Sequence, residues 1–263
     1  MNFQPVLPLG GYAGWGVLKR TMAAQQQAFQ ASAVNQRDEA YFRERIGAIN
    51  TAEELVADRR LLGVALGAYG LENDINNRYF IRKVLEDGTL TEDALANRLA
   101  DKQYLKFSSA FGFGDYAIPG NKVSDFADTT LALYRTRQFE AAVGSQNNDY
   151  RYALNAEREL ATLATKTMGE DAKWFTVMGS APLRQVFQTA LGLPTSFAAI
   201  DLDQQLAVLK DKAEARFGAD SISQFSDPAK VEALVKGFLL RSELTTGASA
   251  SSPGMLALQL LQS

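Results

Sequence analysis

The sequence predicts an all-α protein, a multi-helix array or bundle of about ten helices. Apolar residues recur at helical spacing along most of the chain. Helix-capping patterns such as Thr51-x-x-Glu54 precede these stretches, and glycines follow them. Runs that alternate between apolar and polar residues are missing, and β-branched residues are scattered. We therefore expect helices only, joined by short turns.

The N-terminal residues 1–35 are expected to form a flexible arm followed by a weak helix. Prolines and glycines are dense before Val17, and this density opposes regular structure. The stretch from Val17 to Ser32 is rich in Ala and Gln and carries only a sparse apolar stripe. The arm is either a simple extension with aromatic side chains or a recognition or export segment.

A first helical lobe is expected over residues 36–113. Its helices are marked by Asp38, by the Thr51–Glu54 box, by Asn73 or Asp74 and by a second box at Thr89 and Glu92. Glycines 67, 70 and 88 are expected to end helices. The glycine-rich residues 114–122 then predict a linker.

Beyond the linker we expect a helical hairpin plus a second lobe over residues 123–244. Residues 124–143 and 149–165 have the pattern of an antiparallel helix pair. Later helices begin near Ser180, Asp201 and Asp227. Residues 245–263 read as a flexible linker and an apolar C-terminal tail.

A weak internal similarity relates the two lobes. Arg59-x5-Ala65-Leu66-Gly67 matches Arg184-x5-Ala190-Leu191-Gly192 without a gap. The match indicates either an ancient duplication of a helix unit or two independent uses of Ala-Leu-Gly to close a helix.

The amino-acid composition argues against most kinds of catalytic and metal-binding site. The chain has no histidine and no cysteine, so the usual general base, zinc ligand and thiol nucleophile are missing. No phosphate-binding loop or nucleophile elbow occurs. We therefore predict that the protein is not an enzyme and needs no cofactor, although a carboxylate pair remains compatible with the sequence.

The net charge and the hydropathy of the chain limit the kinds of partner and the cellular locations that we expect for the protein. The formal net charge is −3, without a basic stripe, so no nucleic-acid partner is expected. No apolar run reaches the ~20 residues of a membrane span. The first residues lack the pattern of a cleaved signal peptide, so we expect a cytoplasmic protein or one exported without such a signal.

Two groups of residues are candidates for partner contacts. Arg59, Arg60 and Arg184 lie on largely apolar helices, where they either pair with acids between helices or recognise a carboxylate on a partner. The tail either docks on its own body or enters a groove of another subunit or protein. The tail residues concerned are Met255, Leu256, Leu258, Leu260 and Leu261.

The run YFRERIGAINTAEELVADRRLLGVALGAYGLENDINNRYFIRKVLEDG, followed by ALANRLADKQYLKFSSAFGF, resembles an uncharacterised alphaproteobacterial family. KWFTVMGSAPLRQVFQTALGLPTSFAAIDLDQQL and VEALVKGFLLRSEL are similar to the same family's second half. Its members are typically encoded in flagellar gene clusters, near rod and basal-body genes. The resemblance supplies no functional residue.

The resemblance implies a flagellum-associated accessory or structural protein, acting through protein–protein contacts in basal-body or rod assembly. The alternative is a cytosolic export chaperone or adaptor that binds a client helix, and the third reading is an enzyme of unknown type. The expected partner is a flagellar or other protein, or a second copy of the chain.

Overall fold

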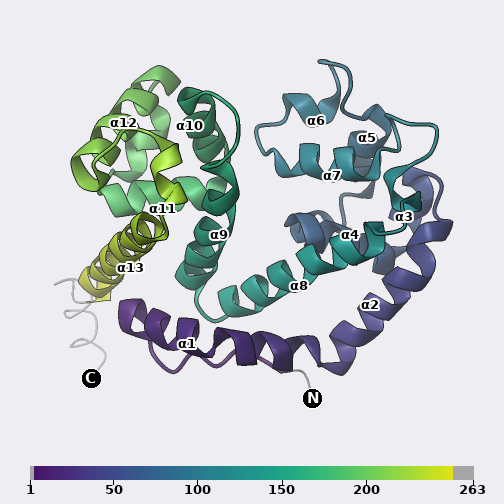
Figure 1. The fold of residues 1–263 in the computed structure, drawn as a ribbon, viewed down its shortest axis with the longest axis horizontal. Coiled ribbons are helices and arrows are strands. Elements are labelled where there is room, and N and C mark those ends of the chain that lie inside the picture. Colours follow the sequence, from purple (N-terminus) through teal and green to yellow (C-terminus); the bar gives the residue numbers. More distant parts are fainter. Residues whose placement is uncertain (1–2, 251–263) are drawn as a thin grey trace, which may run out of the picture. The chain divides into compact units, whose positions relative to one another are not determined.

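The computed structural model describes residues 3–250, and every regular element in that range is a helix (Figure 1). This confirms the predicted all-α class. Thirteen α-helices occur among the described residues, because short helices such as α3 and α6 add to the ten expected. They are α1 (Gly11–Gln30), α2 (Ala33–Arg45), α3 (Ala52–Ala57), α4 (Arg59–Tyr69), α5 (Arg78–Asp87), α6 (Leu95–Arg98), α7 (Gln103–Phe111), α8 (Phe126–Gly144), α9 (Asn148–Leu163), α10 (Glu170–Gly179), α11 (Ala181–Leu191), α12 (Leu202–Phe217) and α13 (Pro228–Ala250).

The chain forms two compact units, which we call unit 1 and unit 2. Unit 1 contains Thr21–Val143 together with the N-terminal residues up to Val6, and unit 2 contains Leu7–Arg20 and the chain from Gly144 onward. The division therefore falls at the end of α8, and not at residues 114–122, where the sequence suggested a linker. Those residues lie within unit 1 because buried hydrogen bonds, described below, attach them to it.

The glycine-rich N-terminal stretch is helical from Gly11, where an irregular arm was expected. Tertiary contacts explain the difference. Trp15 and Leu18 are buried, and the Trp15 ring lies 5.9 Å from the ring of Tyr150 on α9. The Tyr150 hydroxyl lies 2.8 Å from the carbonyl oxygen of Gly11. Burial of aromatic surface thus outweighs the low helix propensity of glycine.

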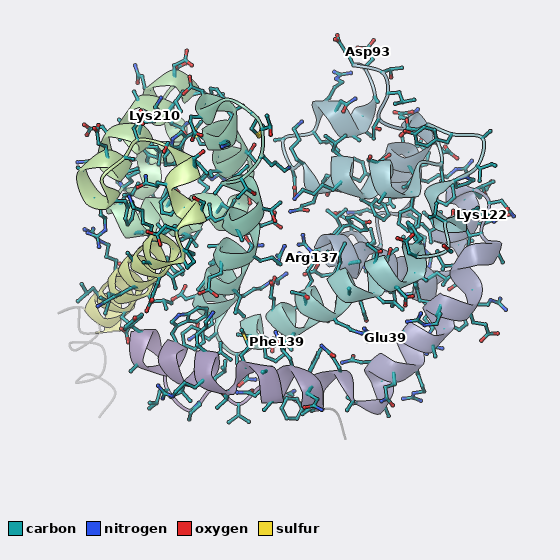
Figure 2. All side chains as sticks on the ribbon, viewed as in Figure 1. Glu39, Asp93, Lys122, Arg137, Phe139 and Lys210 are labelled. Carbon is teal, nitrogen blue, oxygen red and sulfur yellow. The ribbon has the colours of Figure 1, made fainter. Side chains whose placement is uncertain are left out.

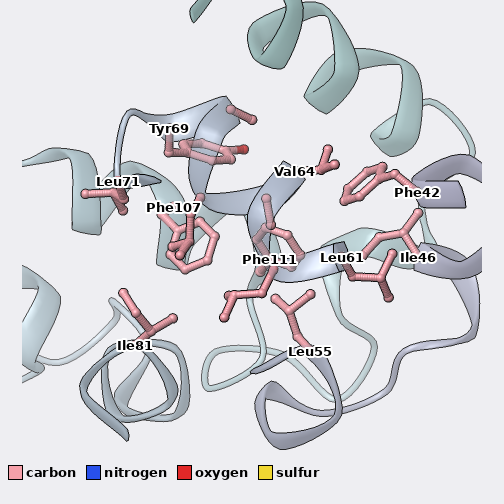
Figure 3. Packing of buried hydrophobic residues seen from close by; sticks show 14 of the residues in the cluster. Phe42, Ile46, Leu55, Leu61, Val64, Tyr69, Leu71, Ile81, Phe107 and Phe111 are labelled. Carbon is pink, nitrogen blue, oxygen red and sulfur yellow. The ribbon is translucent and has the colours of Figure 1, made fainter. Parts of the chain in front are cut away.

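Unit 1 is built around α4, on which the side chains of Leu61, Leu62, Val64, Ala65, Leu66 and Ala68 are almost fully buried. Phe42 of α2, Leu55 of α3 and Ile81 of α5 pack in the same core (Figure 3). Aromatic rings fill the rest: Phe111 lies 5.1 Å from Phe107 and 5.0 Å from Phe126. The apolar stripes predicted over residues 36–113 thus converge on one helix.

Unit 2 has its own aromatic core. The Phe187 ring on α11 lies 5.3 Å from the ring of Trp174 on α10 and 5.3 Å from that of Phe225. Phe238 of α13 is fully buried. This last helix continues to Ala250, beyond Leu244, where a flexible linker was predicted. The added turns contain one glycine and no proline, and a single glycine costs a helix only about 1 kcal/mol.

The two units share a helix–cap–helix arrangement. In unit 1 the single extended residue Asp58 separates α3 from α4, and in unit 2 Ser180 separates α10 from α11 in the same way. Both second helices have 11 residues and end at a left-handed glycine, Gly70 or Gly192. The next residue closes each end: the amide of Leu71 donates to Leu66 O, and that of Leu193 donates to Gln188 O, each at 2.9 Å.

This arrangement corrects the alignment suggested by the sequence. Gly67 lies inside α4, whereas Gly192 ends α11, so the two Ala-Leu-Gly triplets are not equivalent. The helix ends require a shift of 122 residues, from Gly70 to Gly192. Arg59 is the first residue of α4, whereas Arg184 is the fourth residue of α11. A shift of 122 residues therefore does not align these two arginines. Three buried pairs do match, namely Leu61 with Leu183, Val64 with Val186 and Ala68 with Ala190.

We predict that Gly192→Ala destabilises unit 2. The φ angle of Gly192 is +70°, and a methyl group there would lie 2.1 Å from Nη1 of Arg241. The left-handed conformation alone costs about 1–2 kcal/mol for alanine, and displacement of the guanidinium adds to this cost. Urea unfolding followed by circular dichroism measures the loss.

The matched control is Gly47→Ala, because a methyl group at Gly47 meets nothing within 4 Å and its φ is not positive. A Gly192→Ala protein as stable as the Gly47→Ala protein would contradict the proposed role of the left-handed end.

Candidate interaction surface

Arg60 holds α2 against α4. Its Nε lies 2.7 Å from Oδ1 of Asp38, and its guanidinium lies 4.6 Å from the centre of the Tyr41 ring. The Tyr41 hydroxyl donates to Asp58 Oδ2 at 2.7 Å, and Asp58 Oδ1 accepts from the amides of Arg60 and Leu61. Burial favours a higher pKa for Asp58, but these hydrogen bonds outweigh it, and the pKa is lowered. Arg60 thus forms an ion pair between α2 and α4, as one of its two interpretations expects.

The other sequence-predicted candidates lie in unit 1, in unit 2 or outside the described residues. Arg59 donates to the amide oxygen of Asn76 at 3.0 Å, on the surface of unit 1. Arg184 belongs to unit 2, where its half-buried side chain makes no hydrogen bond or ion pair with a described residue. Met255, Leu256, Leu258, Leu260 and Leu261 lie outside the described residues. The arginine candidates therefore belong to two different units.

A buried polar network in unit 2 was not predicted from the sequence. The Lys173 ammonium, only 3% exposed, donates to the carbonyl oxygen of Ala164 at 3.1 Å, to Glu170 at 3.0 Å and to Ser223 Oγ at 2.6 Å. The other Glu170 oxygen accepts from the backbone amides of Ile222 and Ser223. Lysine next to serine is a known nucleophilic pair. Here the Ser223 hydroxyl and the Lys173 side chain both donate to Glu170, so the network ties residues 222–223 to α10.

This network lowers the pKa of the Glu170 carboxyl group. Burial acts to raise its pKa, but the hydrogen bonds from the Ser223 hydroxyl, from Lys173 and from the Ser223 amide overcome that effect and lower the pKa to about 2. The ionised carboxylate is therefore part of the folded structure at any pH above that value.

The loops that follow α5 and α7 expose large apolar side chains on unit 1. Leu90 is 67% exposed, Tyr116 59%, Ile118 74% and Val123 58%. We call these four residues the loop patch. Exposed apolar side chains of this size lower the solubility of a protein, and they commonly mark a binding site where several occur on one surface. The loop patch is the strongest candidate interaction surface among the described residues.

The two loops are braced against each other and against the core. The Asp115 carboxylate accepts from the amide of Thr89 at 2.6 Å, from the Thr89 hydroxyl at 2.8 Å and from the amide of Leu90 at 3.2 Å. Asn121 is buried, and its Nδ2 donates to the carbonyl oxygens of Ile46 and Ile49. The patch residues thus stand on a fixed frame, which lowers the entropy lost when a partner binds.

Sequence reasoning missed this surface because residues 114–122 were interpreted as a linker. The signal was nevertheless present: Tyr116 and Ile118 are large apolar residues within a Gly/Pro-rich segment, where a plain linker would be polar. Asp115 and Asn121 gave no signal of their own, because their partners lie 25 or more residues away.

Two further features describe the surface and interior. No helix within residues 3–250 has the length and hydropathy needed to cross a membrane. In the same range, no group of three or more acidic residues gathers closely enough to hold a metal ion.

Residues 68–231 match the family described as "Protein of unknown function (DUF1217)". The chain belongs to this family. The match extends from the end of α4 to the first turn of α13, so it includes the loop patch and the Lys173 network. The predicted membership of an uncharacterised family is thereby confirmed.

A solved structure is also similar. The crystal structure of protein AGR_C_984 from Agrobacterium tumefaciens superposes with a TM-score of 0.72 at 25% sequence identity, covering 92% of this chain and 99% of that one. A search of curated proteins finds no significant match. The similarity therefore extends over nearly the full length of both chains.

The Glu170 network predicts how stability depends on pH. A pKa lowered from 4.5 to about 2 means that the network stabilises the folded protein above pH 4.5 and that this contribution disappears as the pH falls toward 2. Glu170→Gln should therefore be less stable than wild type at neutral pH, and its unfolding free energy should fall less between pH 5 and pH 3.

The measurement is urea unfolding of both proteins across this pH range. Glu214→Gln is the matched control, because Glu214 is exposed on α12 and its side chain bonds no described residue. Parallel pH curves for wild type and Glu170→Gln would contradict the assignment.

Proposed function

We propose that the protein works without catalysis, through protein–protein contacts, as an accessory or structural factor in the assembly of the flagellar basal body or rod. The observation that carries the binding role is the loop patch, four large apolar side chains more than half exposed on braced loops. The flagellar setting is supported by the resemblance to a family encoded beside rod and basal-body genes.

The polar residues support the same interpretation. Arg60, one of the candidates for partner recognition, is engaged by Asp38 and Tyr41, and the buried Lys173 is engaged by three acceptors. These groups are occupied in holding helices together. The loop patch, in contrast, exposes apolar side chains that a protein partner could cover.

A deletion strain tests the proposed setting. We expect loss of swimming and fewer flagellar filaments with normal growth, because a basal-body factor is needed for the flagellum and not for metabolism. Swimming in soft agar and filament counts by electron microscopy measure this. Normal motility with a normal number of filaments would disprove the flagellar role.

Cell fractionation of the complemented strain then distinguishes a structural part of the basal body from an export chaperone or adaptor. Recovery of the protein with purified basal bodies supports a structural part. Recovery only in the soluble cytoplasmic fraction supports the export chaperone or adaptor considered from the sequence.

A variant of the loop patch tests the binding role. We expect Leu90→Ser combined with Ile118→Ser to fold like wild type, because both side chains lie on the surface, and to fail to restore swimming. Leu202→Ser in unit 2 is the control, since Leu202 is also 57% exposed. Full rescue by the double variant, confirmed as folded by its melting curve, would contradict a role for the patch.

A further inference from the structure

We infer that unit 2 binds an acidic helix of a partner protein through a row of hydrogen-bond donors on α11 and α13. The row consists of the side chains of Arg184 and Gln188 on α11 and of Arg241 on α13, and we call it the donor row. The donor row belongs to unit 2, whereas the loop patch belongs to unit 1, and its role rests on the proposed protein-binding function.

Helix geometry and one close contact bring the three side chains together. Arg184 and Gln188 are four residues apart, so they are neighbours on one face of α11. The amide of Gly192, four residues further on, donates to the carbonyl oxygen of Gln188 at the end of the helix. The Arg241 guanidinium lies against this glycine, because a methyl group at Gly192 would lie 2.1 Å from its Nη1 and 3.0 Å from its Cζ. The donor row thus extends from the first turn of α11 to its C-terminal end.

The donors of the row are unmet among residues 3–250. Arg184 and Arg241 make no side-chain hydrogen bond or ion pair with a described residue. Nε2 of Gln188 is buried and has no hydrogen-bond partner in the same range. Arg184 and Gln188 are half-buried and Arg241 is exposed, so water satisfies these groups only in part. Unmet donors away from water are costly, and acceptors supplied by a partner would remove that cost.

The acids nearest to Arg184 in the sequence bind other groups. None occurs between Asp171 and Asp201, so the helical neighbours of Arg184 on α11 include no carboxylate. Asp171 pairs at 3.0 Å with Lys210 of α12, which is labelled in Figure 2. Asp201 accepts from two backbone amides at the start of α12. Neither carboxylate neutralises Arg184.

The acids nearest to Arg241 are also directed elsewhere. Glu243 follows it by two residues, and residues two apart do not face each other on a helix. The Glu243 carboxylate instead lies at Gly11, where a methyl group would be 1.6 Å from its Oε1. Glu232 accepts from the Tyr12 hydroxyl at 3.2 Å.

The charge of unit 2 does not oppose an acidic partner. Unit 2 contains equal numbers of basic and acidic residues, so the net charge of −3 belongs to unit 1. Two guanidinium groups without carboxylate partners therefore give the donor row a local positive potential. At physiological salt the field of more distant charges is screened beyond about 8 Å, so the local charge decides which ligand is attracted.

The length of the donor row indicates the form of the ligand. From Arg184 to Gly192 the helix rises by about 12 Å, at about 1.5 Å per residue. Donors in a line of this length do not converge on one phosphate or one carboxylate. A helix with glutamates at i, i+4 and i+8 presents three carboxylates over the same distance on one face. Guanidinium groups bind carboxylates through two parallel hydrogen bonds, so an acidic helix lying along α11 satisfies the donor row.

The test uses two fluorescein-labelled alanine-based helices, one with glutamate and one with glutamine at positions i, i+4 and i+8. Fluorescence anisotropy with the full-length protein measures binding. We expect the glutamate peptide to bind at least about tenfold more tightly than the glutamine peptide, with an affinity that falls as salt is added.

Variants locate the binding. Arg184→Gln with Arg241→Gln should weaken binding of the glutamate peptide by about tenfold. Arg184→Lys with Arg241→Lys keeps the charge but not the planar guanidinium, so it should lose less. The matched control is Lys166→Gln with Lys212→Gln, which removes two exposed cations of unit 2 and should change binding by less than about twofold. Circular dichroism melting curves check that each variant is folded.

The wild-type protein locates the site without any substitution. Addition of the glutamate peptide should shift the side-chain Nε–Hε signals of Arg184 and Arg241 in a proton–nitrogen correlation spectrum. The signal of Arg216 on α12 should stay in place. Shifts at Arg216 alone would contradict the location even if a variant failed to fold.

Equal binding of both peptides overturns the preference for an acidic ligand, and an equal loss in the lysine control overturns the location. Displacement of the peptide by inorganic phosphate at the peptide's own concentration indicates a site for a single anion and overturns the acidic helix. If neither peptide binds while the loop-patch variant fails to restore swimming, the donor row is wrong and the proposed function stands. If the glutamate peptide binds at the donor row while the deletion strain swims normally, the site is correct and the flagellar role is wrong.

Discussion

Each unit depends on the burial of one short helix, α4 in unit 1 and α11 in unit 2. An isolated helix of 11 residues is only marginally stable in water, so packing must supply its stability. Burial in turn requires that the polar backbone groups at both ends find partners. A one-residue cap before the helix and a left-handed glycine after it meet this requirement at Asp58 and Gly70.

The same requirement explains where the polar side chains are used. Arg60 joins α2 to α4 through Asp38, Lys173 joins α10 to the segment at residues 222–223, and Asn121 and Asp115 attach loops to the core of unit 1. Long-range hydrogen bonds of this kind give loops fixed conformations. In unit 1 the fixed loops carry Leu90 and Ile118 on the surface, so the bonding that stabilises the fold also shapes the proposed interface.

This arrangement suits a protein that works by contact. A braced apolar surface loses little entropy on binding. Both loops of the patch fall within residues 68–231, the part of the chain that matches the DUF1217 family. Other members with apolar residues at the same loop positions would present the same kind of surface.

The sequence by itself determined the helical class, the caps at Thr51 and Asp201, and most of the apolar faces, because these depend on residues within one or two turns. It misplaced the boundary between units, the start of α1 and the equivalence of Arg59 with Arg184, and it did not find the loop patch. Those features depend on contacts between distant residues, such as Tyr150 with Gly11 and Asn121 with Ile46. Only the tertiary structure brings such residues together, since local spacing contains no information about which distant groups will meet.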